Sequence, residues 1–157
     1  MPKFNVTRRV PYNVEQVYEI AGDVSKYKEF MPLVRRSLVR NRVKHADGTE
    51  TMESELEVSY KKLGIKETLR SRVTVNWARK LVTSQSSEPP VTHLNAQWQI
   101  REIGPDECEI EFNVDYALKS RAMQFVLSGM FDLVVRKVMN AFEERARELY
   151  GPGKASA

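Results

Sequence analysis

The feature that most constrains the fold is a change in hydrophobic period near Ser120. Before this residue, apolar and polar residues alternate, most clearly over 49–60, as in strands that bury one face. After it, the period is about 3.6 residues as far as Tyr150, which predicts one amphipathic helix on the order of 40 Å long. Ser120 is a suitable N-cap, and Gly151 with Pro152 a suitable end. Strands followed by a single long helix predict an α+β domain in which the helix packs on one face of the sheet.

The shorter elements follow from the same kind of pattern. A first strand over 3–10 ends before Pro11, and Asn13 then caps a helix with apolar residues at helical spacing. A second short helix covers 25–30 and stops before Pro32. Further strands are expected over 37–45, 49–60, 65–75, 81–87, 93–103 and 107–118, with a hairpin turn at Asp47-Gly48. The sequence thus predicts an antiparallel sheet of about seven strands.

Length and composition fit one domain. We expect a single domain over 1–150 and a disordered tail over 151–157. The chain has one cysteine, no pattern of a secretory signal, and no apolar stretch of the roughly 20 residues that cross a bilayer. These features predict a cytoplasmic protein, and they leave peripheral contact with the inner membrane open.

Basic residues gather in one stretch, 35–44, which contains no acid, in a chain of formal net charge +4. Such a run is typical of a solvated edge strand. It also suits a surface that meets an anionic membrane or RNA.

Several segments, taken in order, resemble one known family. They are 10–12, 23–33, the strands 55–60 and 67–73, the strand 94–100, and the helix end 141–151. Their order and spacing are similar to those of the coenzyme Q-binding branch of the START-like, polyketide cyclase-related superfamily. Within 23–33, the family's pattern is matched by Asp23, Tyr27, Phe30 and Pro32, whereas Lys28 replaces a proline and Leu33 a tryptophan.

The resemblance implies a helix-grip fold, in which a curved antiparallel sheet wraps around the long C-terminal helix and two short helices follow the first strand. It implies a hydrophobic cavity between sheet and helix, with ubiquinone or a similar polyisoprenoid lipid as ligand. It also implies a quinone carrier or chaperone that supports respiratory electron transport or quinone biosynthesis, with no enzymatic activity and no cofactor.

The candidate cavity residues lie on the inward phase of the strands and the helix, or in the segment 23–33. Apolar candidates suit a prenyl tail, and they are Met31, Pro32, Leu56, Val58, Leu69, Val73, Ile100, Met130 and Val134. Four others bring hydrogen-bond donors or aromatic faces that suit a quinone head: Tyr60, Ser71, Trp98 and Tyr116. For each of these residues, ordinary packing in the core is the alternative.

The sequence offers little for catalysis or metal binding. His45 and His93 have no cysteine or carboxylate at metal-ligand spacing, and no phosphate-binding glycine loop, nucleophile elbow or paired-cysteine motif occurs. Cys108 stands between Glu107 and Glu109, whose charges would raise the pKa of its thiol. We therefore expect neither catalytic nor metal-binding residues.

Three alternatives stay open. Some bacterial proteins of the same superfamily are ribosome-association toxins that bind the large ribosomal subunit; the basic run fits RNA, although the glutamates at 53, 55 and 57 count against it. A polyketide cyclase or aromatase would instead need Asp, Glu, His or Arg side chains inside the cavity. Peripheral docking on an anionic membrane through Phe30, Met31 and Leu33, beside the arginines, is a further hypothesis.

Overall fold

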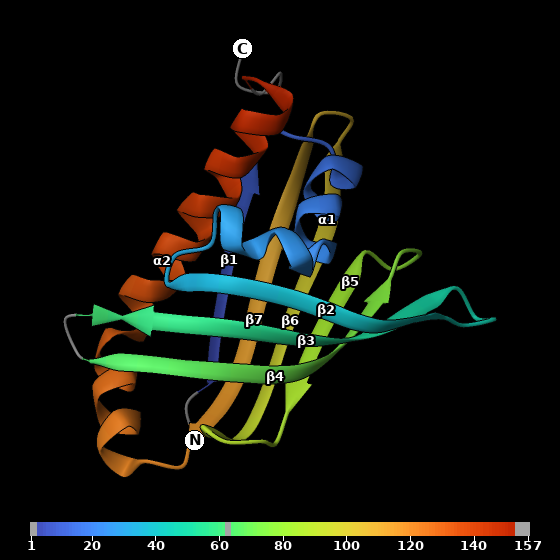
Figure 1. Ribbon diagram of the computed structural model, residues 1–157. Coiled ribbons are helices and arrows are strands. Elements are labelled where there is room, and N and C mark those ends of the chain that lie inside the picture. Colours follow the sequence, from blue (N-terminus) through green and yellow to red (C-terminus); the bar gives the residue numbers. More distant parts are fainter. Residues whose placement is uncertain (1–2, 62–63, 153–157) are drawn as a thin grey trace.

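The computed structural model describes residues 3–61 and 64–152, and its elements follow the expected order (Figure 1). They are β1 (Lys3–Val10), α1 (Val14–Gly22), the 3-10 helix η1 (Val24–Glu29), β2 (Val34–Lys44), β3 (Thr49–Tyr60), β4 (Ile65–Asn76), β5 (Leu81–Ser86), β6 (Val91–Gly104), β7 (Glu107–Leu118) and α2 (Arg121–Tyr150). Of the expected disordered tail, residues 153–157 lie outside the described part of the chain.

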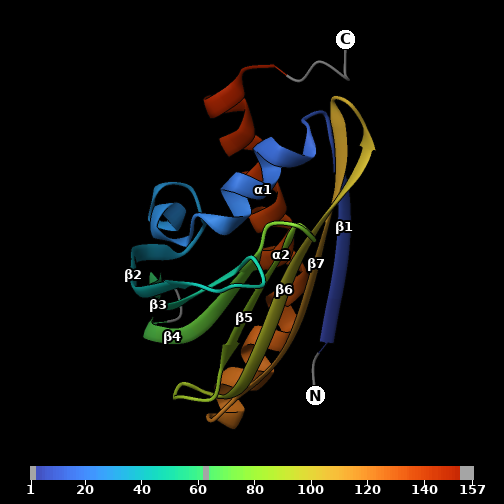
Figure 2. The same ribbon diagram turned by 90° about the vertical axis from the view of Figure 1, so that its right-hand side faces the viewer.

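The strands form one antiparallel sheet in the order β1-β7-β6-β5-β4-β3-β2. The strands β2, β3 and β4 run across the direction of β1, β7 and β6, so the sheet is strongly curved (Figure 1). The helix α2 lies on the inner side of this curve, and α1 packs beside its C-terminal part (Figure 2). The predicted helix-grip architecture is confirmed.

Local chemistry explains where the helices begin and end. The Asn13 side chain accepts from the backbone N–H of Gln16 while the Gln16 side chain accepts from the N–H of Asn13, a reciprocal cap that starts α1. Ser120 caps α2 by accepting from the N–H of Met123. Gly151 ends it at a φ of 77°, a left-handed conformation that glycine adopts without a steric penalty.

Two strands begin earlier than the alternation predicts. β2 begins at Val34, opposite Val58 of β3, and β6 begins at Val91, opposite Leu118 of β7. In both strands the register of pairing shifts just after the first residue. This irregularity interrupts the alternation of apolar and polar residues, so the pattern does not reveal where the strand begins.

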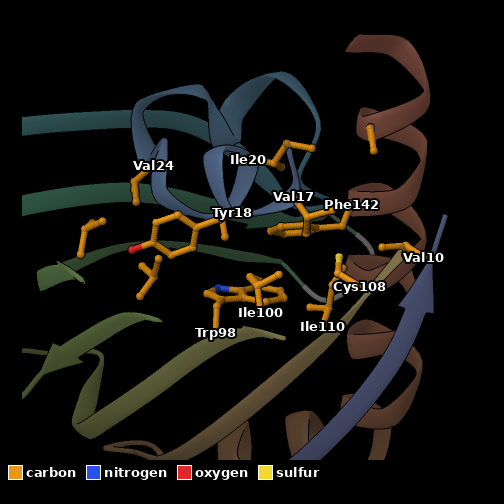
Figure 3. Close-up of a cluster of buried hydrophobic side chains, with 14 of the residues drawn as sticks. Val10, Val17, Tyr18, Ile20, Val24, Trp98, Ile100, Cys108, Ile110 and Phe142 are labelled. Atoms are coloured by element: carbon orange, nitrogen blue, oxygen red, sulfur yellow. The ribbon is translucent and has the colours of Figure 1, made fainter. Parts of the chain in front are cut away.

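A closed core occupies one half of the molecule, between α1, the C-terminal part of α2 and the sheet (Figure 3). Phe142 of α2 stacks on Trp98 with ring centroids 4.4 Å apart. Tyr18 of α1 is fully buried and donates from its hydroxyl to the Leu81 carbonyl oxygen. Val17 of α1 and Ile110 of β7 belong to the same core. In the described part of the chain, no helix combines the length and apolarity needed to span a bilayer.

Candidate ligand-binding site

The two halves of α2 are buried to different degrees. Its fully buried residues are Val135, Met139, Phe142 and Ala146, all in the C-terminal half. In the N-terminal half, over 121–134, no side chain of the described helix is fully buried, and the inward-facing ones such as Met130 and Val134 are only half-buried. The sheet and the helix are therefore packed tightly at one end of the grip and less tightly at the other.

The sheet has a matching set of half-buried apolar residues opposite this part of the helix. Leu56 of β3 pairs with Leu69 of β4, and both are half-buried. Leu94 of β6 is half-buried and pairs with Tyr116 of β7, whose ring stacks on Phe131 of α2 at 5.0 Å. We call this set the outer apolar region; it comprises Leu56, Val58, Leu69, Leu94, Tyr116, Met130, Phe131 and Val134.

Tyr116 is the polar exception inside this region. Its side chain is 2% exposed, and its ring stacks on that of Phe131, which in turn stacks on Phe4. Its hydroxyl oxygen is buried, and it has no hydrogen-bond partner among residues 3–61 and 64–152. Burial raises the pKa of Tyr116, and a weak side-chain interaction with the Ser128 hydroxyl of α2, outside the geometry of a full hydrogen bond, partly opposes the rise. A buried donor without an acceptor is unusual in a folded protein and calls for a physical explanation.

A cleft of about 1050 Å³ opens between β4 and β5. The strands β4 and β5 pair only from Arg72 opposite Gln85 to Asn76 opposite Leu81, so the first half of β4 is paired with β3 alone. The cleft is lined by Arg40, Asn41, Val43, Thr51, Met52, Glu53, Ser54, Glu55, Arg70, Ser71, Arg72, Gln85, Ser86, Ser87 and Glu88.

One residue that lines this cleft stands in the same cross-strand row as Tyr116. Ser86 pairs with Leu94, and Leu94 pairs with Tyr116, so the three side chains form one cross-strand row on the inner face of the sheet. Ser86 also lines the cleft. The row therefore contains one residue of the cleft, Ser86, and two of the outer apolar region, Leu94 and Tyr116.

The predicted cavity residues divide between the two halves of the molecule. Val73, Trp98 and Ile100 are buried in the closed core, and Met31 and Leu56 pack against it. Tyr116 is buried outside that core, and Ser71 lines the cleft. The remaining candidates, Pro32, Val58, Tyr60, Leu69, Met130 and Val134, are half-buried and lie outside the core. Their contact with a ligand stays a prediction.

Sequence reasoning missed the aromatic neighbours of Tyr116. Phe4 and Phe131 stack on each other at 4.2 Å, although one lies in the first strand and the other in the last helix. Alternation and helical spacing mark both as inward-facing, but nothing local indicates that they meet. Leu94 and Ser86 were missed for the same reason, because their importance comes from pairing across the sheet.

The basic stretch lies on β2 and faces glutamates of β3. Arg40 pairs with Glu55 at 3.0 Å, and Arg42 approaches Glu50 at 3.9 Å. Asn41 donates to Glu53. The stretch is thus an exposed strand in which Arg40 and Arg42 are matched by acids across the hairpin.

Membrane docking through Phe30, Met31 and Leu33 stays a prediction, and all three side chains are half-buried. Phe30 and Met31 pack against the core, and the Phe30 ring lies 5.5 Å from that of Phe142. Part of the apolar surface of Phe30 and Met31 is therefore used inside the protein.

The structure also shows the surroundings of the side chains that were considered for catalysis or metal binding. In the described part of the chain, the buried polar or charged residues are Ser37 and Ser54, and no three potential metal ligands gather. Burial raises the pKa of the Cys108 thiol to about 12, with a smaller effect from Glu107. Asp115 of the neighbouring strand lies 3.0 Å from the Nε2 atom of His93, a contact between strands that the spacing of residues in the sequence does not reveal.

Comparison with known proteins identifies a matching family and several similar proteins. The model of the family described as polyketide cyclase / dehydrase and lipid transport matches residues 10–143. The persistence and stress-resistance toxin PasT of Escherichia coli O6:H1 is 27% identical over 150 residues, which cover 96% of this chain and 90% of that protein. The ribosome association toxin RatA of Escherichia coli K12 is 26% identical over the same shares of the two chains.

A further relative is the mitochondrial coenzyme Q-binding protein COQ10 of Drosophila melanogaster, which is 30% identical over 148 residues, 91% of this chain and 57% of that protein. Among solved structures, an 18 kDa protein from Caulobacter crescentus has a TM-score of 0.80 at 28% identity and covers 97% of this chain and 100% of its own. A START superfamily protein from Mycobacterium smegmatis has a TM-score of 0.79 at 18% identity, covering 94% and 98%, a likeness that shows the fold.

Proposed function

The chain belongs to the polyketide cyclase / dehydrase and lipid transport family, and from this premise we propose that it binds ubiquinone or a similar polyisoprenoid quinone in the outer apolar region. Similarity to a coenzyme Q-binding protein over 91% of the chain supports a quinone as the ligand. The chain spans 57% of that relative, so the likeness concerns this domain alone.

The observation that carries the proposal is the buried hydroxyl of Tyr116. A buried O–H group without an acceptor costs on the order of 1–3 kcal/mol, a cost that a ligand acceptor would remove. A quinone carbonyl oxygen is such an acceptor, and it belongs to a flat ring that aromatic side chains contact well. Phe131 stacks on the Tyr116 ring at 5.0 Å and on Phe4 at 4.2 Å, so Tyr116 belongs to a cluster of aromatic rings.

Other residues of the outer apolar region suit the rest of the ligand. Val58, Leu69, Met130 and Val134 are apolar and only half-buried, so a prenyl tail placed against them would remove further apolar surface from water. Each Å² of apolar surface so removed contributes about 25 cal/mol. The flexible thioether of Met130 adapts to tails of different shape.

These groups favour binding over turnover. A quinone carrier needs a donor and an apolar surface, and Tyr116 with its neighbours provides both. A cyclase would draw on buried acids or bases, and in the described part of the chain no Asp, Glu, His, Lys or Arg is fully buried. We therefore infer a role as carrier or chaperone of the quinone.

The test combines co-purification with titration. The protein is purified from a quinone-producing host, analysed by native mass spectrometry, and stripped of ligand. It is then titrated with a short-chain ubiquinone, with Tyr116→Phe beside Tyr12→Phe, a control whose hydroxyl already bonds the Gly151 carbonyl oxygen at 2.8 Å. We expect co-purified quinone and weaker binding by Tyr116→Phe alone. A protein that co-purifies with no quinone and takes none up refutes the proposal.

Ribosome association is a second candidate. The chain covers 90% of RatA, and Arg35 and Arg36 at the start of β2 are exposed. No ion pair of either arginine occurs among the described residues, so both are open to phosphate groups. Co-sedimentation with large ribosomal subunits, falling steeply with salt and lost in Arg35→Gln/Arg36→Gln, would favour this candidate. Salt-independent pelleting or an unchanged double variant would refute it.

A further inference from the structure

The N-terminal half of α2 has an unusual composition for a surface helix. Between Ala122 and Val135 it contains a single charged residue, Asp132, whereas the rest of the helix contains seven over 136–150. An ordinary surface helix is apolar on one face and polar on the other, and one that is apolar all round is expected to be covered on all sides. This segment is apolar on both faces but is covered by the protein on only one.

The outward face of this segment is exposed. Phe125 is 83% exposed and Leu133 is 54% exposed, and Val126 lies between them. A Cβ atom added at Gly129 would meet no atom within 4 Å. Ala122, Phe125, Val126, Gly129 and Leu133 therefore form an apolar surface without a partner in the described chain, which we call the α2 outer face.

Basic residues border the α2 outer face at both ends. Lys119 and Arg121 precede it, Arg136 and Lys137 follow it, and all four are exposed. The single acid within it, Asp132, pairs with Arg136 at 3.1 Å. An apolar surface with positive charge at both ends is complementary to a bilayer that carries anionic headgroups.

We propose that the α2 outer face docks on an anionic lipid bilayer. Its residues lie on the same helical turns as Met130 and Phe131, whose side chains meet the proposed quinone site from the opposite side of the helix. Docking therefore places that site one helix diameter, about 10 Å, from the bilayer surface. The purpose of the docking rests on the proposed function, but the docking itself is measured without quinone.

The charges favour a bilayer over a second copy of the chain. Both ends of the α2 outer face are basic, so two copies packed through it would bring like charges together in either the parallel or the antiparallel orientation. A bilayer with anionic lipids meets both basic ends favourably.

The experiment is flotation of the whole protein with phosphatidylcholine vesicles, with and without phosphatidylglycerol. The test variant is Leu133→Gln, and the matched control is Leu149→Gln, because Leu149 lies in the same helix and is 50% exposed. We expect binding to the anionic vesicles that decreases with salt, a loss of about tenfold or more in Leu133→Gln, and binding near that of the unaltered chain in Leu149→Gln. Circular dichroism and urea unfolding check that both variants fold.

Four outcomes overturn the docking: equal binding of the two variants, equal binding to neutral and anionic vesicles, no binding to either, and a concentration-dependent dimer that Leu133→Gln abolishes. Quinone titration without vesicles separates the two proposals. Vesicle binding by a chain that takes up no quinone supports the docking and refutes the proposed function. Loss of quinone affinity in Leu133→Gln overturns the docking, because it assigns Leu133 to the ligand site.

Discussion

Removal of the Tyr116 hydroxyl should change stability and ligand affinity in opposite directions. Tyr116→Phe keeps the ring stacked on Phe131 and removes only a buried oxygen that has no hydrogen-bond partner in the described chain. Because an unsatisfied buried hydroxyl costs about 1–3 kcal/mol, we expect the free energy of unfolding of the ligand-free protein to rise by about 1 kcal/mol. Most substitutions in a core lower it.

The same substitution removes the donor that the quinone carbonyl would accept from. A hydrogen bond of this kind contributes a net of about 0.5–1.5 kcal/mol, so the dissociation constant for a short-chain ubiquinone should increase by about threefold to tenfold. A merely structural role for Tyr116 would lower stability and affinity together.

The assay is urea unfolding of ligand-free protein, followed by circular dichroism, beside the quinone titration. Tyr12→Phe is the control, because its hydroxyl bonds the Gly151 carbonyl oxygen, and it should lose about 1 kcal/mol of stability. If Tyr116→Phe loses as much as Tyr12→Phe, the Tyr116 hydroxyl is satisfied in the folded protein and the reasoning is refuted.

Three further predictions concern parts of the molecule outside the ligand region. Gly129→Ala should raise the free energy of unfolding by about 0.5–1 kcal/mol, measured by urea unfolding, because the position is helical and a Cβ meets nothing within 4 Å. Phe142→Ala should lower it by about 3–5 kcal/mol, also in urea, since the side chain is 1% exposed and stacks on Trp98. Cys108 should resist iodoacetamide at pH 8 in the folded protein and react once urea unfolds it, because burial raises its pKa to about 12; mass spectrometry of the labelled chain measures both rates.

The sequence predicted the elements well because each carries its own signal. Residues 49–60 and 107–118 alternate without interruption, and the structure has strands at Thr49–Tyr60 and Glu107–Leu118. The ends of α2 were predictable because Ser120 caps its start and Gly151 its end. Local patterns of this kind need no knowledge of the rest of the chain.

The site was less predictable because it depends on which inward faces meet. Alternation marks Val73, Trp98 and Tyr116 alike as inward-facing, yet the first two lie in the closed core and Tyr116 lies outside it. The packing of α1 and of the C-terminal part of α2 makes this difference, and no pattern along one strand contains it. The matching of Arg40 with Glu55 was hidden likewise, because it depends on the pairing of two strands.

The position of β1 has a consequence for how the protein folds during synthesis. The strands β2 to β7 each pair with the next along the chain, so they can assemble in order as they leave the ribosome. β1 instead waits for β7, because its partners such as Asn113, opposite Asn5, lie on the order of a hundred residues later. The aromatic stack of Phe4 on Tyr116 and Phe131 forms only after that pairing and after the last helix is made. The surroundings of the Tyr116 hydroxyl are therefore among the last parts of the chain to form, and a nascent chain gains them only when nearly all of it has been synthesised.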